Sequence, residues 1–446
     1  MPPATGKKAG IASLAATRSL ALRKPYAHAR GKLPARALAG VKKSQMRDLY
    51  LSLLSRLLVH CYYHRARLLN PENRPAAGPI LYVGLHRNGA VDGCVYKSLL
   101  PESVFMISVQ LRRSVIGRMF FDGIEVVRDK DRGHDRGGEN SIAIERCIEH
   151  LRRGGALFVM PEGTSDLGHR HLPFKTGAAR IVATALLAGL RPTVVPVGIH
   201  YERAWAWQSD VEVVLGPPLP LDLPPGSSGP AAVDLLHRRI SAGLETLAVG
   251  APDAESFARR ERAALVATLG SGRSYFAALK AMEAGVPEAE TALANFEKFA
   301  ADRPLFKYQG VPLLPARHIW ADVVHALVLA PLVAAAGLLN LPPLLIAWGA
   351  GRRFADARNT IALWRLLAGF PVFLTWTAGL LALAIMTGHW PLWMVYAALS
   401  WLGLRSLGRL KKLAVRLGNL WRAPDLRARL LALHRRIDAA LSARGL

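Results

Sequence analysis

Cysteine is scarce in this sequence, and its few copies lie far apart. The 446 residues contain only Cys61, Cys94 and Cys147, and no two of them form a C-x-x-C pair. A disulfide framework or a zinc site needs regularly or closely spaced cysteines, so neither is predicted, and a reducing cytosol suits the chain. Dinucleotide and Walker fingerprints are missing as well, so neither a metal nor a resident cofactor is expected.

Acidic residues are few relative to basic ones. Asp and Glu number 32 against 58 Lys and Arg, which gives a formal net charge of +26. A protein this basic binds polyanions, either nucleic acid or the anionic leaflet of a membrane. No helix-turn-helix, zinc-ligand or aromatic stacking pattern accompanies the charge. We therefore expect no nucleic acid and predict anionic membrane lipids as partners.

The amino-terminal region is basic, and its first 45 residues include no acidic side chain. Residues 1–45 contain ten Lys or Arg and no Asp or Glu, which predicts a flexible tail resting on anionic lipid. Arg18 interrupts its only apolar stretch and argues against a signal peptide, while an organellar transit peptide stays open. Over residues 45–69, leucines and tyrosines recur at helical spacing. This pattern predicts an amphipathic helix, lying either at the membrane interface or against a protein core.

Two stretches near the carboxyl terminus lack charge of either sign. Residues 323–351 and 366–404 contain no Asp, Glu, Lys or Arg, and a membrane span needs about 20 apolar residues. The second stretch is long enough for two crossings with a break at 387–389. Asn-Leu-Pro-Pro at 340–343 predicts that the first is a hairpin. By the positive-inside rule, the arginines that flank both stretches lie in the cytoplasm.

Short apolar runs alternate with helical patterns between Pro79 and Pro218. Such alternation predicts an α/β domain with a largely buried sheet. The strands are expected at 80–84, 104–108, 124–127, 156–160, 193–197 and 211–215, and the helices at 140–152 and 178–190.

A histidine and an aspartate follow the first of these predicted strands. His86 and Asp92 belong to the run Gly-Leu-His-Arg-Asn-Gly-Ala-Val-Asp-Gly. At a strand-to-helix junction the carboxylate can fix the tautomer of the imidazole and stabilise its protonated form, which makes the histidine a general base. A purely structural hydrogen bond is the commoner role for such a pair.

A second polar turn follows the strand predicted at 156–160. It reads Pro161-Glu162-Gly163-Thr164-Ser165, and Lys175 comes just before the next predicted helix. The backbone amides of a Gly-Thr-Ser turn and a lysine at a helix start can bind an anion. The alternative is a tight turn without a ligand.

Taken in order, the motifs of residues 80–220 resemble those of the glycerolipid acyltransferase superfamily, which contains glycerol-3-phosphate and 1-acylglycerol-3-phosphate acyltransferases. The matching runs are His86 to Asp92, Gly123-Ile-Glu-Val-Val-Arg128, Pro161-Glu-Gly-Thr-Ser165 and Val195-Pro-Val-Gly198. The family places four residues between His and Asp, whereas this chain has five, as in a fungal subgroup with C-terminal membrane segments. We expect the Asn88-Gly89 turn to absorb the extra residue. Otherwise Asp92 points away from His86 and the chain is inactive.

The resemblance implies an α/β acyltransferase domain with a mainly α-helical C-terminal membrane region. The predicted parts are a basic flexible tail (1–45), the α/β domain with its N-terminal amphipathic helix (46–225), a helical linker region (226–318), membrane hairpins (319–404) and a basic amphipathic surface helix (405–446). The protein is expected to be integral to a membrane, with its catalytic domain on the cytoplasmic side.

The resemblance also implies roles for residues. His86 takes the proton from an acceptor hydroxyl that attacks an acyl thioester, and Asp92 orients His86. The acceptor binds to Arg128, Glu162, Gly163 and Thr164, and we add Lys175 as a second cation. The G-x-S-x-G motif is absent, so direct transfer is expected. The donor is acyl-CoA or acyl-carrier-protein, with no other cofactor, and the acceptor is 1-acylglycerol 3-phosphate or glycerol 3-phosphate in phospholipid synthesis.

Other functions stay open. The altered His-to-Asp spacing and the large basic surface also fit a catalytically inactive membrane scaffold or lipid-binding protein, and another lysolipid could be the acceptor. A transporter is a weaker alternative, because the apolar segments lack charged side chains that could bind a coupling ion.

Overall fold

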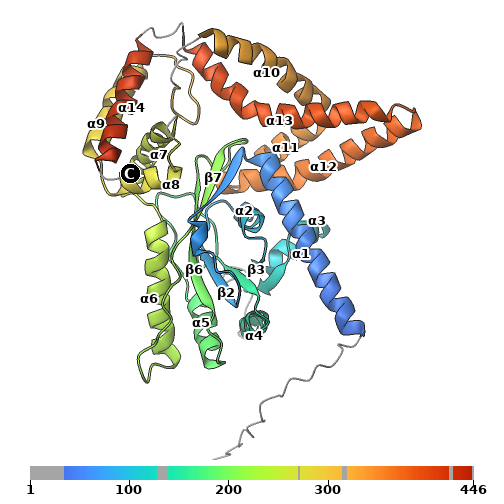
Figure 1. The fold of residues 1–446 in the computed structure, drawn as a ribbon, viewed down its shortest axis with the longest axis vertical. Coiled ribbons are helices and arrows are strands. Elements are labelled where there is room, and N and C mark those ends of the chain that lie inside the picture. Colours follow the sequence, from blue (N-terminus) through green and yellow to red (C-terminus); the bar gives the residue numbers. More distant parts are fainter. Residues whose placement is uncertain (1–34, 128–138, 270–271, 314–318, 421–424, 444–446) are drawn as a thin grey trace, which may run out of the picture. The chain divides into compact units, whose positions relative to one another are not determined.

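The computed structural model describes residues 35–127, 139–269, 272–313, 319–420 and 425–443 (Figure 1). The chain divides into two compact units, residues 1–47 and 48–446. In the smaller unit, the described part is the beginning of helix α1 (Ala35–Tyr62). All the elements that follow α1 belong to the larger unit.

A seven-stranded sheet with the order β1-β7-β6-β2-β5-β3-β4 organises the larger unit (Figure 1). The five strands from β6 to β4 are parallel, β7 runs antiparallel to β6, and β1 is parallel to β7. Because β2, β5 and β6 are parallel, the loops that follow them emerge at one edge of the sheet. The strands are β1 (Arg65–Leu69), β2 (Ile80–Gly84), β3 (Ser103–Ser108), β4 (Gly123–Val126), β5 (Ala156–Val159), β6 (Thr193–Tyr201) and β7 (Asp210–Leu215).

Helices cover this sheet and complete its core. Helix α4 packs beside β4, β5 and α5, and α6 packs on α5 and β6. The side chains of Leu236, Ile240 and Leu244 from α6 join the sheet's core, so this domain extends past the boundary predicted at 225. The helices are α2 (Val91–Leu99), α3 (Val115–Phe120), α4 (Glu139–Arg152), α5 (Gly177–Leu187) and α6 (Gly229–Leu247), with short 3-10 turns at Pro71–Asn73 and Val109–Arg112.

The predicted amphipathic helix at 45–69 differs from the structure at its end. Helix α1 stops at Tyr62, and residues 65–69 form strand β1 instead. The guanidinium groups of Arg65 and Arg67 pair with Asp210 and Glu212 on β7, so alternate basic residues fasten an edge strand. Within α1, Leu58 is buried in the sheet's core while Leu53 is 54% exposed. One side of the helix is therefore packed against protein and the other carries exposed leucine.

A second core lies in the helical region that follows α6. It is built by α7 (Ala254–Thr268), α8 (Tyr275–Glu283), α9 (Pro287–Ala301) and α14 (Leu426–Ser442). The prediction for residues 405–446 was a helix lying on the membrane. In the structure, Leu430, Leu433 and Ile437 of α14 are buried in this second core. The apolar face of α14 thus packs on protein.

Four helices occupy the predicted membrane region: α10 (Ile319–Leu339), α11 (Leu341–Arg353), α12 (Arg358–Met386) and α13 (Trp390–Gly418). Helices α10 and α12, of 21 and 29 residues, are long and apolar enough to cross a membrane. Only 11% and 17% of their most apolar windows are buried, unlike the core helices of a soluble domain. Together with the resemblance to the glycerolipid acyltransferases, these two helices indicate a membrane protein.

The hairpins follow the predicted breaks only in part. Helix α12 ends and α13 begins on either side of residues 387–389, where a break was predicted. Helix α11 has 13 residues, or about 20 Å, which is short of the roughly 30 Å apolar core of a bilayer. The first stretch therefore has one helix of spanning length rather than a complete return crossing.

Candidate active site

The two predicted polar motifs meet because their strands are neighbours. Strand β2 ends at Gly84 and leads to His86, and β5 ends at Val159 and leads to the turn at 161–165. These strands pair in parallel, so both loops leave the same edge of the sheet side by side. The backbone amide of Asp166 donates to the carbonyl oxygen of His86 at 3.3 Å and ties the loops together.

His86 and Asp92 are in direct contact. The distance from His86 Nδ1 to Asp92 Oδ2 is 2.9 Å, and the side chains are 15% and 0% exposed. An ionised carboxylate can only accept, so Nδ1 carries the proton and Nε2 keeps its lone pair. No hydrogen bond to Nε2 is formed by the described residues. The imidazole is thus oriented by Asp92, and its basic nitrogen stays unpaired among the described residues.

The carboxylate of Asp92 is fixed from several sides. Oδ2 also accepts the backbone N–H groups of Arg87 at 2.6 Å and Asn88 at 2.8 Å, and Oδ1 accepts the hydroxyl of Tyr201 at 2.6 Å. Burial, followed by the charge of Asp92, raises the pKa of Tyr201 well above its ordinary value, so Tyr201 stays a donor. Tyr201 was missed by sequence reasoning, since it ends a strand far along the chain and belongs to no motif.

The extra residue between His86 and Asp92 is accommodated by a well-anchored turn. Gly89 has a φ of 58°, in the left-handed region that favours glycine. Asn88 is fully buried, and its Nδ2 donates to the hydroxyl of Tyr63 at 2.8 Å and the carbonyl of Ala204 at 3.1 Å. The five-residue spacing therefore still brings Asp92 to His86.

Glu162 braces the two motifs against each other. Its carboxylate accepts the backbone N–H of His86 at 2.7 Å and that of Leu172 at 2.9 Å. The side chain is 2% exposed, and this burial raises its pKa, against the opposing effect of the two amide hydrogen bonds. Both carboxylate oxygens therefore accept hydrogen bonds from the backbone, one from His86 and one from Leu172. A contact between Glu162 and an acceptor stays a prediction.

Lys175 lies beside the predicted anion-binding turn. Its Nζ and Cε are 3.4 Å from the point where a Cβ on Gly163 would stand, and its amide donates to the carbonyl of Pro161. Gly163 has a φ of 70°, which again favours glycine. Thr164 is half-buried in the same turn. Arg128, the predicted phosphate ligand, lies outside the described residues.

A candidate membrane helix reaches this site. Nδ2 of Asn359, in the first turn of α12, donates to the carbonyl and the hydroxyl of Ser165, each at 2.9 Å. Its carbonyl oxygen is 3.0 Å from the point where a Cβ on Gly89 would stand. Helix α12 therefore contacts both loops of the candidate site, and no motif in the sequence predicts this contact.

We predict that Glu162→Gln lowers both stability and activity. One of its two amide partners would then face an NH₂ group instead of an oxygen, which leaves a buried donor unsatisfied and costs about 1–3 kcal/mol. Thermal unfolding should occur at a lower temperature than in the wild type. Glu255→Gln is the matched control, because Glu255 lies on the surface of α7 with an exposed i,i+4 pair to Arg259. Equal melting temperatures for both variants would contradict the bracing role.

The arrangement suits general-base chemistry on a hydroxyl. It offers an oriented imidazole, a buried carboxylate to stabilise the imidazolium and a turn with a lysine for an anion. Within the described ranges, no group of three or more His, Cys, Asp or Glu side chains is placed to hold a metal ion.

Comparison with known proteins finds similarity to acyltransferases. Residues 65–200 match the family described as Acyltransferase. The chain is 28% identical over 121 residues to glycerol-3-phosphate O-acyltransferase 2 of Saccharomyces cerevisiae, a stretch covering 26% of this chain and 16% of the yeast protein. The chain thus spans only a small part of that relative. A crystal structure of the 1-acyl-sn-glycerophosphate (LPA) acyltransferase from Thermotoga maritima is 18% identical, covers 48% of this chain and 83% of its own, and has a TM-score of 0.33.

Proposed function

We propose that this chain, in which residues 65–200 form an acyltransferase domain of the glycerolipid acyltransferase superfamily, transfers a fatty acyl group from a thioester to a hydroxyl of a phosphate-bearing glycerolipid precursor. The contact between His86 and Asp92 is the observation that carries the proposal. It supplies a base where the family motif expects one, in spite of the extra residue.

In the proposed reaction, His86 Nε2 takes the proton of the acceptor hydroxyl as its oxygen attacks the thioester carbonyl. Asp92 stabilises the imidazolium that forms. The C–S bond then breaks, the carbonyl re-forms as an ester, and the imidazolium returns its proton to the leaving thiolate. General-base catalysis of this kind contributes about 10²–10⁴-fold. The donor is acyl-CoA or acyl-carrier-protein.

The acceptor is proposed to be anionic and to lie at the membrane. Lys175 lies against the Gly163 turn, and Arg128 is the further predicted cation; a guanidinium can bind two phosphate oxygens at once. Helix α12 combines a contact to the catalytic loops with the length of a membrane span, so a lipid-like acceptor could reach the site laterally. We therefore rank 1-acylglycerol 3-phosphate slightly ahead of glycerol 3-phosphate, with the domain on the cytoplasmic side.

An acceptor panel tests the proposal. Detergent-purified protein is incubated with radiolabelled acyl-CoA and either 1-acylglycerol 3-phosphate, glycerol 3-phosphate or uncharged monoacylglycerol, and the lipid products are separated by chromatography. We expect transfer to a phosphate-bearing acceptor, and we expect Arg128→Lys to raise its KM more than it lowers kcat, because a point charge cannot replace two parallel hydrogen bonds.

Two outcomes would count against this proposal. Equal transfer to monoacylglycerol, with a rate insensitive to Arg128→Ala, would show that the enzyme does not recognise a phosphate on the acceptor. Absence of transfer to every acceptor would favour the inactive scaffold.

A further inference from the structure

A large cavity lies next to the catalytic pair, and most of its lining lies outside the family motifs. It has a volume of about 790 Å³, and its lining includes Leu85 and Arg87, the neighbours of His86 in the chain, as well as Tyr201, which binds Asp92. Ligand sites in proteins commonly occupy about 300–1,000 Å³. The cavity is thus large enough for a small molecule and adjoins the reaction centre.

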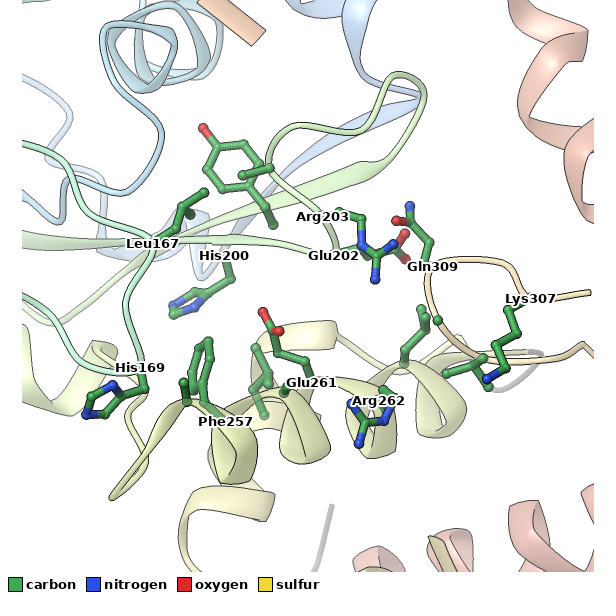
Figure 2. A pocket seen from close by; sticks show the side chains of 18 of the residues that line it. Leu167, His169, His200, Glu202, Arg203, Phe257, Glu261, Arg262, Lys307 and Gln309 are labelled. Carbon is green, nitrogen blue, oxygen red and sulfur yellow. The ribbon is translucent and has the colours of Figure 1, made fainter. Parts of the chain in front are cut away.

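The opposite wall of the cavity is formed by helices of the second core. Helix α7 contributes Phe257, Glu261 and Arg262, and Figure 2 shows Glu261 pointing from α7 into the cavity, towards the side where His200 lies. These residues lie beyond residue 200, where the match to the acyltransferase family ends. The site is therefore made jointly by residues inside the family match and residues that follow it in the chain.

Basic side chains outnumber acidic ones in the lining. The acids are Glu202, Glu261 and Glu297, and Glu297 already pairs with Arg262 at 2.6 Å. The cations are Arg87, Arg203, Arg262, Arg303, Lys307 and Arg358. An excess of cations in a partly enclosed space attracts an anion, because the low-dielectric walls strengthen the field.

Arg203 is the cation best placed to receive an anion. It has no ion pair with a carboxylate of the described residues, and its guanidinium carbon lies 5.5 Å from the ring centre of Trp205. Arg358 approaches the same ring at 5.1 Å. A stacked guanidinium keeps its N–H edge available for two hydrogen bonds to a phosphate.

Apolar side chains from two helices also line the cavity and suit a hydrocarbon portion. Phe257, Leu265, Leu293 and Phe296 come from α7 and α9 and face the same space. A ligand that satisfies both parts carries a phosphate and an apolar segment.

We propose that this cavity binds a phosphate-bearing amphiphile at a site separate from the Gly163–Lys175 turn, with Arg203 as its principal phosphate ligand. Given the proposed function, two sources have this chemistry: the phosphate-bearing carrier of the acyl donor and a glycerophospholipid. Neither Gly163 nor Lys175 lines the cavity, so the two anion sites are distinct.

Binding without turnover tests the proposal. Full-length His86→Ala protein in detergent is titrated with two radiolabelled probes, coenzyme A and 1-oleoylglycerol 3-phosphate. Arg203→Gln should weaken the binding of at least one probe about tenfold, the loss expected for a charge-assisted hydrogen bond. The probe that responds identifies the source. Arg191→Gln is the control, because Arg191 is 77% exposed and outside the cavity, and should change affinity less than about twofold.

Glu261→Gln should increase the affinity for the probe, a result that misfolding of the variant cannot produce. The carboxyl lies among Arg87, Arg203 and Arg262, and burial raises its pKa to about 7 despite these cations. Removing its charge should tighten binding several-fold at pH 8. At pH 6 the wild-type carboxyl is already largely protonated, so the gain should be smaller there. The lining also contains other titratable groups, and both proteins share them: His169, His171, His200, Tyr201, Glu202 and Glu297.

Either result is decisive for the cavity. Loss with Arg203→Gln and gain with Glu261→Gln, both retained in a Lys175→Ala background, support it. Affinities for both probes that match the Arg191→Gln control would overturn it. Because no turnover is measured, a wild-type protein without transferase activity would overturn the proposed function and leave this test unaffected.

Discussion

Replacing His86 by alanine should lower the rate of acyl transfer by about three orders of magnitude, within the range that general-base catalysis supplies. The imidazole is the group with a tautomer fixed by Asp92 and a basic nitrogen that stays unpaired among the described residues. Without it, water must take the proton of the acceptor hydroxyl. The initial rate of label transfer from acyl-CoA to 1-acylglycerol 3-phosphate measures the loss.

The fold should survive this change. Asp92 keeps its bonds to the amides of Arg87 and Asn88 and to Tyr201, so the loop retains its main anchor. His237→Ala on α6 serves as control, because His237 lies outside both the catalytic loops and the cavity. A wild-type rate in the His86→Ala protein, or an equal loss in the His237→Ala protein, would overturn the mechanism.

The sheet could be predicted because most of its strands are buried on both faces. All five residues of β2 and all four of β5 are buried, and such strands appear in the sequence as uninterrupted apolar runs. Strand β1 could not be predicted from such a run. Its alternate arginines pair with Asp210 and Glu212 on β7, so its stability depends on partners that local sequence does not reveal.

Within the site, the sequence predicted contacts between near neighbours and missed those between distant ones. His86 and Asp92 are six residues apart, and the turn between them fixes their approach. Tyr201 lies 109 residues from Asp92, and Asn359 lies 194 residues from Ser165. Those partners are set by strand order and helix docking, which no local motif encodes.

The cavity was missed for a similar reason. Over residues 226–318 the sequence predicts only a helical linker region, because isolated charges such as Glu261 and Arg262 are typical of solvated helix faces. Only the packing of α7 against the loop after β6 places these charges in an enclosed space beside Arg203. Their electrostatic environment is therefore a tertiary property.

Asp92→Asn should be nearly as damaging to catalysis as loss of the histidine, yet should leave the site folded. Oδ2 accepts from His86 and two backbone amides, so an NH₂ group cannot occupy that position. The amide must therefore present its oxygen there and its NH₂ to Tyr201, whose hydroxyl can turn and accept. The imidazole keeps its orientation and loses the negative charge that stabilises its protonated form.

The expected result for Asp92→Asn is a fall in kcat of about 10²–10⁴-fold, the range for general-base catalysis, with little change in the KM of either substrate. Steady-state kinetics with acyl-CoA and 1-acylglycerol 3-phosphate measure both constants, and a melting curve close to that of the wild type confirms that the fold is retained. Adding the change to His86→Ala should cause little further loss, because Asp92 acts through the imidazole. Full additivity of the two losses would instead assign Asp92 a separate role, since its charge would then matter when no imidazolium can form.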